Sequence, residues 1–119
     1  MFIRAVNAAN IVTLNKLINV MVKHIVLFKL KEELPLDEKE SIMKSFKDAI
    51  EALPKHISFI REIEVGINMN SSEEWDIALY SVFDSLEDVK AYSIHPAHVE
   101  AAKILANAKK DRSCVDYQL

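Results

Sequence analysis

A tyrosine and two histidines stand close together in the segment AYSIHPAHVEAA, residues 91–102. Histidine is the side chain that most readily exchanges a proton near neutral pH, and a tyrosine hydroxyl can hydrogen-bond to a carbonyl oxygen that becomes an enolate. His98 would lie in the first turn of a helix starting at Pro96, where the positive end of the helix dipole disfavours imidazolium. The pattern therefore predicts proton transfer, with neutral His98 as the base and Tyr92 polarising a carbonyl.

A third histidine, His24, lies in the segment VKHIVLFKL, residues 22–30, which is rich in β-branched and aromatic residues and predicts a strand. If its strand face points toward the helices, His24 lines one cavity with Tyr92 and His98 and orients the substrate. Such a mostly apolar cavity with a few polar groups is typical of a site for a small apolar or phenolic molecule. The apolar residues expected to bind this ligand are Val26, Phe28, Trp75, Ile77 and Leu79.

Each of these polar residues also has an ordinary structural interpretation. His95 precedes Pro96 and is expected to cap the helix. His24 on an apolar strand face is compatible with a hydrogen-bonded core histidine, and His98 with a histidine at the protein surface. Tyr92 is compatible with a core residue whose hydroxyl lies at the rim. The residues alone leave the structural and the chemical interpretation open.

Metal and thiol chemistry are not expected from this sequence. His95 and His98 are spaced so that both could reach one ion, but three well-placed ligands are not evident. Cys114 lies in the last predicted strand without an activating neighbour in the sequence. We therefore expect no metal and no other cofactor.

The segments that must position these residues follow the order β-α-β-β-α-α-β. Asp37 and Glu40 are spaced as a capping box at the start of the first helix, and Ser85 is expected to cap the second. Strands are predicted at 22–30, 60–68, 75–83 and 111–119, and helices at 36–53, 84–94 and 96–110.

This order predicts an α+β, ferredoxin-like fold, in which a four-stranded antiparallel sheet carries helices on one face. The first and third strands are apolar on their second face as well, so that face would expose a sizeable apolar patch in a monomer. A second copy of the chain related by a twofold axis would cover it and form a dimeric α+β barrel. The residues that carry this homodimer prediction are Ile25, Leu27, Ala78, Tyr80 and Val82.

Composition excludes several classes of protein. The chain has 119 residues and a net charge of -3, which suits a single domain and argues against a nucleic-acid or anionic membrane partner. Gly66 is its only glycine, so neither a dinucleotide-binding fingerprint nor a P-loop can be built. A single cysteine excludes an intrachain disulfide, and a cytoplasmic location fits best.

Residues 1–20 differ from the rest of the chain, because Arg4 and Lys16 are their only charged residues and four asparagines interrupt the apolar positions. The segment is too polar to span a bilayer and lacks a secretory cleavage pattern. A transit peptide is a weaker alternative, because serine is absent. We expect an N-terminal extension over 1–20, added by an upstream start or as a short helix, and one domain over 21–119.

Three segments resemble the stress-responsive dimeric α+β barrel (Dabb) family: MVKHIVLFKLKEELP at 21–35, FDSLEDVKAYSIHPAHVE at 83–100 and the terminal VDYQL. The resemblance implies a homodimer of ferredoxin-like protomers. The family includes plant stress-induced proteins and a cofactor-independent polyketide cyclase, whose catalytic tyrosine and histidine match Tyr92 and His98 and whose pocket histidine matches His24. A further histidine of that cyclase is replaced by Asp76.

Two functions follow from these observations. The first is a stress-responsive homodimer that binds a small apolar or phenolic ligand between the sheet and the helices. The second is a cofactor-independent enzyme with polyketide-cyclase-like aldol or proton-transfer chemistry, in which His98 is the base and Tyr92 polarises a carbonyl.

Overall fold

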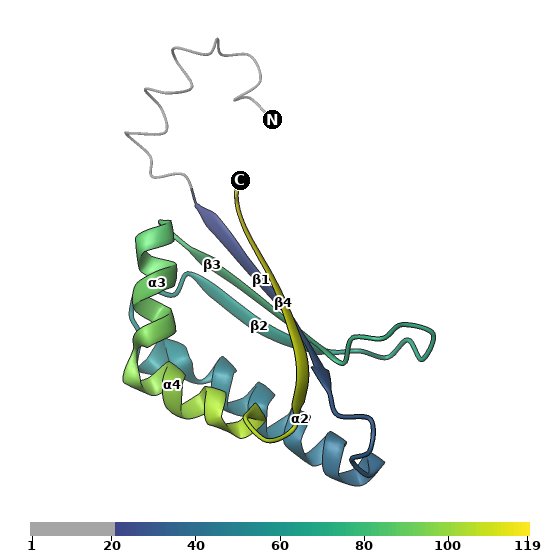
Figure 1. Ribbon diagram of the computed structural model, residues 1–119. Helices are drawn as coiled ribbons and strands as arrows, with labels where there is room; N and C mark the ends of the chain where they lie inside the picture. The colour runs from purple at the N-terminus through teal and green to yellow at the C-terminus, as the bar shows by residue number, and fades with distance from the viewer. Residues whose placement is uncertain (1–20) are drawn as a thin grey trace.

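Helices cover one face of a single antiparallel sheet in the computed structural model, which describes residues 21–119 (Figure 1). The observed order of strands and helices is the predicted one. The strands are β1 (Val22–Leu30), β2 (Glu62–Ile67), β3 (Ile77–Phe83) and β4 (Lys109–Gln118), and the helices are α2 (Leu36–Glu51), α3 (Leu86–Ile94) and α4 (Pro96–Ala102). The extension expected over 1–20 lies outside the described residues.

The strand order across the sheet is β2-β3-β1-β4, and all three neighbouring pairs are antiparallel. In this arrangement the chain crosses over through helices between β1 and β2 and between β3 and β4, as the split βαβ motif requires. On central strand β1, Val26 lies opposite Leu79 of β3 and Cys114 of β4. The predicted α+β, ferredoxin-like fold is confirmed.

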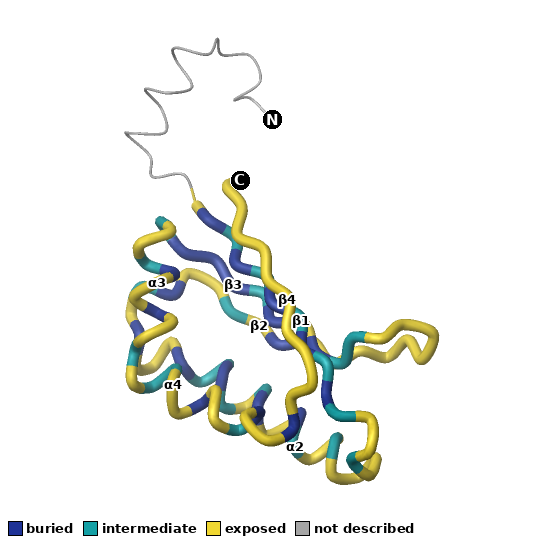
Figure 2. Tube along the Cα trace, viewed as in Figure 1, coloured by how far each residue is buried: buried dark blue, intermediate teal, exposed yellow. Residues whose placement is uncertain are grey.

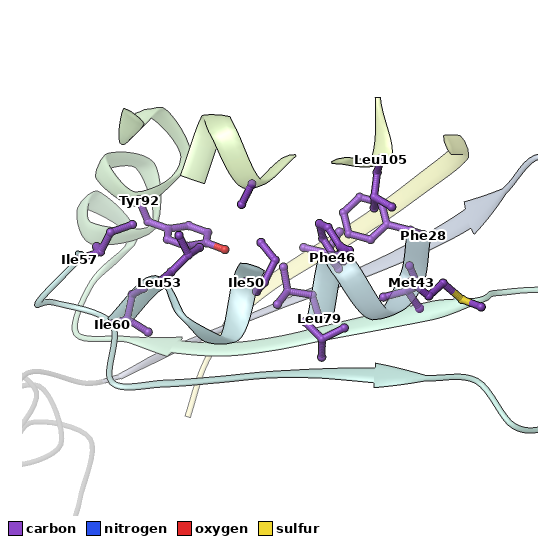
Figure 3. Close-up of a cluster of buried hydrophobic side chains, with 14 of the residues drawn as sticks. Phe28, Met43, Phe46, Ile50, Leu53, Ile57, Ile60, Leu79, Tyr92 and Leu105 are labelled. Atoms are coloured by element: carbon purple, nitrogen blue, oxygen red, sulfur yellow. The ribbon is translucent and has the colours of Figure 1, made fainter. Parts of the chain in front are cut away.

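The hydrophobic core fills the space between the sheet and the helices. Residues of β1 alternate between buried and half-buried positions, and His24 lies on the buried side with Val26 and Phe28. Phe46 and Ile50 of α2 pack onto this side of the sheet (Figure 3). Full burial of such a side chain contributes about 1.5–3 kcal/mol to folding, so this core fixes the helices over His24.

The starts of the helices agree with the sequence at two positions and differ at a third. The Ser85 hydroxyl accepts a hydrogen bond from the Asp88 amide at 3.1 Å, and His95 Nδ1 accepts one from the Ala97 amide at 3.1 Å. Both residues cap their helices as predicted. The capping box at the start of α2 was wrong, because Pro35 occupies the cap position and no side chain caps this helix.

The opposite face of the sheet carries no helix and is only partly buried (Figure 1). In a single chain Ile25, Leu27 and Tyr80 are half-buried, Ala78 is exposed and Val82 is buried, so part of the apolar surface predicted for this face is open to solvent. Edge strand β4 is exposed along its whole length (Figure 2). Across residues 21–119, none of the helices has the length and apolar character needed to cross a bilayer.

Candidate functional site

A cavity of about 120 Å³ lies between the sheet and the helices and opens beside edge strand β4. Most of its wall is aliphatic or aromatic, and a few polar side chains interrupt it. Its lining residues are His24, Val26, Phe28, Phe46, Leu79, Ser93, His98, Ala102, Leu105, Lys109 and Arg112. In Figure 3, Phe28, Phe46 and Leu105 lie together at one end of the core. This composition is typical of a small-molecule site, although the volume is small.

His98 enters this cavity from the first turn of α4 and is held by one backbone hydrogen bond. Its Nδ1 lies 3.0 Å from the carbonyl oxygen of Ser93, so Nδ1 carries the hydrogen and donates it. In the neutral ring Nε2 is then left with a free lone pair. Burial lowers the pKa of His98 below its ordinary value of 6.5, and the hydrogen bond to Ser93 opposes this shift only in part. His98 is therefore a neutral base at pH 7.

Tyr92 packs against His98, with the two ring centroids 4.4 Å apart, and its ring lies 6.1 Å from that of His24. The side chain is fully buried, and within residues 21–119 its hydroxyl has no hydrogen-bond partner. Burial raises the pKa of the Tyr92 phenol well above its ordinary value, so the hydroxyl stays protonated and is available as a donor. Figure 3 shows the hydroxyl at the inner end of the side chain, on the side where Ile50 lies. Of the three residues predicted to line one cavity, only His24 and His98 do so, whereas Tyr92 contacts their rings without lining the cavity.

His24 is buried on β1 and is oriented by a residue of the neighbouring strand. Its Nδ1 lies 2.5 Å from a carboxylate oxygen of Asp116, which stands opposite His24 in the register of β4. A carboxylate only accepts hydrogen bonds when ionised, so Nδ1 donates. A carboxylate partner of this kind fixes the tautomer and orientation of an imidazole. The Sγ atom of Cys114 lies 3.7 Å from the same nitrogen.

The polar side chains in and beside the cavity come from two strands that are far apart in the sequence. His24 lies on β1, whereas Lys109, Arg112, Cys114 and Asp116 lie on β4. The sequence analysis did not name Asp116, Ser93, Lys109 or Arg112 as functional. A signal for Asp116 was present, because Val115 and Tyr117 alternate with Asp116 along the last predicted strand, which puts Asp116 on the opposite face from these two apolar residues. The pairing of β4 with β1, which brings Asp116 to His24, is not encoded in any local pattern.

One group of side chains has the composition of a metal site. The ligand atoms of His24, Cys114 and Asp116 all lie within 4.8 Å of one another. A metal ion would have to replace the hydrogen bond between His24 and Asp116 and to deprotonate the thiol. Burial raises the pKa of Cys114, and the charge of Asp116 raises it further. These residues fit a hydrogen-bonded cluster better than a metal site.

The predicted ligand-binding residues divide into three groups. Val26, Phe28 and Leu79 line the cavity. Ile77 is buried in the adjoining core, where it pairs with Phe28 across the two strands. Trp75 is not brought to this cavity, because β3 begins only at Ile77.

Trp75 instead lines a shallow groove with Leu27, Gly66 and Ala78 on the uncovered side of the sheet. Its neighbour Asp76 explains this position. The carboxylate of Asp76 accepts a hydrogen bond from the Leu30 amide at 2.7 Å, while its own amide donates to the Phe28 carbonyl. Asp76 thus holds the end of β1, and the chain before it is outside the regular strand.

Residues 22–119 match the family model described as the stress responsive A/B barrel domain, Dabb. The chain belongs to the Dabb family. This membership, expected from its opening strand and its HPAH segment, is confirmed over nearly the whole described part of the chain.

Characterised and solved relatives of this Dabb chain include a bacterial structure and two plant proteins. A dimeric protein of unknown function with a ferredoxin-like fold from Bacteroides fragilis NCTC 9343 is 64% identical, with a TM-score of 0.82 over 83% of this chain and 96% of the other. Olivetolic acid cyclase from Cannabis sativa is 29% identical over 66% of this chain and 76% of its own length. The stress-response A/B barrel domain-containing protein HS1 from Arabidopsis thaliana is 28% identical over 82% and 88%, respectively.

Proposed function

We propose that this Dabb chain forms a homodimer and that each protomer binds a small aromatic or phenolic molecule in the cavity between its sheet and its helices. The observation that carries the proposal is the Tyr92 hydroxyl, which is buried without a partner against the ring of His98. Buried polar groups in folded proteins nearly always have a hydrogen-bond partner. Tyr92 does not line the cavity itself, but its ring contacts that of the lining residue His98, and a ligand oxygen that passes this ring would supply the missing partner.

The size of the cavity supports a small ligand. Cavities of drug-sized ligands are several times larger than 120 Å³, whereas an engineered apolar cavity of about 150 Å³ binds benzene. One aromatic ring therefore matches the available space. The wall of Val26, Phe28 and Leu105 would contact the faces and edges of this ring, and the histidines would meet its polar substituent.

The homodimer is supported by the uncovered face of the sheet and by a relative. Val115 and Tyr117 of β4 are 53% and 46% exposed on this face, beside half-buried Ile25 and Leu27. Exposed and half-buried apolar side chains gathered on one face of a sheet are typical of a protein interface. The 64% identical structure from Bacteroides fragilis is described as dimeric. Because the cavity lies on the helix-covered face, a partner on the other face would leave its mouth free.

Isothermal titration calorimetry with p-cresol tests the binding proposal. We expect wild-type protein to bind p-cresol and Tyr92→Phe to bind it about tenfold more weakly, because one buried hydrogen bond is lost. Tyr80→Phe is the matched control, since the Tyr80 hydroxyl bonds to Glu62 on the surface of the other face. Equal affinities of the two variants, or no binding by the wild type, would contradict the proposal.

A second candidate function, proton-transfer catalysis, is favoured by the two histidines. His98 is a neutral base whose Nε2 is free, and His24 is oriented by Asp116. With a ketone in the cavity, a proton would pass from the carbon next to the carbonyl to Nε2 of His98. The resulting enolate oxygen would accept a hydrogen bond from Tyr92. Such chemistry would suit the aldol-type or proton-transfer reaction expected from the sequence.

Deuterium exchange into the methyl group of acetophenone, followed by proton NMR in D₂O, tests this second candidate. General base catalysis contributes about 10²–10⁴-fold, so we expect His98→Gln to lose at least about 100-fold of any exchange rate above buffer. His56→Gln is the control, because His56 is exposed and does not line the cavity. Exchange at the buffer rate with the wild type would reject catalysis and leave the binding function standing.

A further inference from the structure

Two positively charged side chains, Lys109 and Arg112, lie at the mouth of the cavity and have no role in the chemistry described above. Both belong to β4, which no helix covers. Arg112 stands opposite Phe28 in the register of β1, so it lies on the same face of the sheet as His24. The polar end of the cavity is therefore cationic, while its interior is apolar.

These two cations differ from the other basic residues around them. Neighbouring Lys110 pairs with Glu32 at 3.0 Å, and Lys103 pairs with Glu100 at 3.1 Å. Within residues 21–119, neither Lys109 nor Arg112 has a carboxylate within ion-pair distance. Their charges are left available to a group that enters the cavity.

The charges that face the cavity do not cancel. Asp116 is the carboxylate on the same face of β4 as Arg112, and it is already hydrogen-bonded to His24. Whether or not His24 carries a proton, the two cations outweigh the single carboxylate. The positive charge of Arg112 also acts on His98, because it is one of the groups that lower the pKa of this histidine. An anion in the cavity would meet a net positive field.

We propose that the ligand is a small aromatic carboxylate, whose ring occupies the apolar part of the cavity and whose carboxylate is bound by Arg112, with Lys109 beside it. This inference rests on the proposed binding function and narrows its ligand class. A guanidinium group binds a carboxylate through two parallel hydrogen bonds, which gives both affinity and orientation. A ring held in this way turns its opposite edge toward Val26 and Leu79, in the interior.

Sodium benzoate and benzamide form the test pair, because they have nearly the same shape and differ in charge. We expect calorimetric titration of the wild type to give a dissociation constant for benzoate at least about tenfold below that for benzamide. Arg112→Gln should weaken benzoate binding by about tenfold and leave benzamide binding unchanged. Because this charge pair is near solvent, added salt should weaken benzoate binding more than benzamide binding.

Lys110→Gln is the matched control, since it removes a neighbouring charge of β4 that is paired with Glu32 and does not line the cavity. It should bind benzoate as the wild type does. Lys109→Gln serves as a second variant if Arg112→Gln does not fold. Equal affinity of the wild type for benzoate and benzamide would overturn the anion site and leave the aromatic site intact. If the wild type binds neither of these compounds nor p-cresol, both proposals fail.

Discussion

The ring of His98 lies 4.4 Å from the ring of Tyr92, and the two side chains reach this contact from different helices across the break at Pro96. His98 is held by the carbonyl of Ser93, whereas the Tyr92 hydroxyl is held by nothing within the described part of the chain. A base with a free lone pair thus lies beside a buried donor without an acceptor. A buried donor without a partner is costly for folding, and under the proposed function a ligand would supply the partner.

Removal of the Tyr92 hydroxyl should not destabilise the protein. In Tyr92→Phe the buried donor without a partner disappears while the ring packing against His98 and Phe83 is kept. We expect the free energy of unfolding in urea to stay the same or to rise by up to about 1 kcal/mol. A loss of more than about 1 kcal/mol would mean that the hydroxyl has a structural partner in solution, contrary to the account.

The pH dependence of stability should carry the signature of buried His98. The pKa of His98 is lowered in the folded protein, so the unfolded chain takes up a proton more readily. Above the unfolded pKa of about 6.5, His98 is neutral in both states and its protonation does not change the free energy of unfolding. As the pH falls below that value, proton uptake by the unfolded chain increasingly favours unfolding, until the pH reaches the folded pKa.

Urea unfolding at a series of pH values between about 7.5 and 5 measures this effect across the interval that contains the ordinary pKa of histidine. His98→Gln should lose less stability than the wild type as the pH falls, because glutamine takes up no proton. His56→Gln, which alters an exposed histidine and leaves His98 buried, should follow the wild type. Identical pH profiles for wild type and His98→Gln would contradict the burial of a neutral His98.

The carboxylate of Asp76 should matter for stability and not for the ligand. It accepts a hydrogen bond from the amide of Leu30, which is buried at the end of β1. Asp76→Ala leaves this amide without its partner, and we expect unfolding in urea to be favoured by about 1–3 kcal/mol. Asp76→Asn retains an acceptor oxygen and should lose less. Because Asp76 does not line the cavity, p-cresol affinity should be unchanged, and a weaker affinity would assign Asp76 to the site instead.

The homodimer should depend on the uncovered face of the sheet. Val115→Glu places a charge on this face at a residue that is 53% exposed in one chain, so the protomer should fold while the dimer dissociates. Light scattering should give about twice the chain mass of 13.6 kDa for the wild type and a single chain mass for the variant. Val99→Glu is the control, because Val99 is 44% exposed on α4, and it should stay dimeric. A monomeric wild type would overturn the dimer.

Local pattern was enough to predict the fold and part of the site. Alternation along 22–30 put His24 on the buried face with Val26 and Phe28, and the position of His95 before Pro96 identified a cap. These features depend on neighbours in the sequence, whose spacing directly sets which way each side chain points.

The remainder of the site depends on contacts between distant segments. Trp75 continues the alternation of the third strand, yet the hydrogen bond from Leu30 to Asp76 ends the regular strand and leaves Trp75 on the other face. The contact between His24 and Asp116 joins residues that are 92 positions apart. The lack of a partner for the Tyr92 hydroxyl could be recognised only after every neighbouring side chain had been placed.

The most direct test of the account is to locate p-cresol on ¹⁵N- and ¹³C-labelled protein by NMR titration. The account predicts that the largest shift changes fall on His24, Ser93, His98 and Leu105, around the cavity, and that they diminish in Tyr92→Phe. Changes confined to the groove of Trp75 on the uncovered face, or the same changes in Tyr92→Phe as in the wild type, would contradict it.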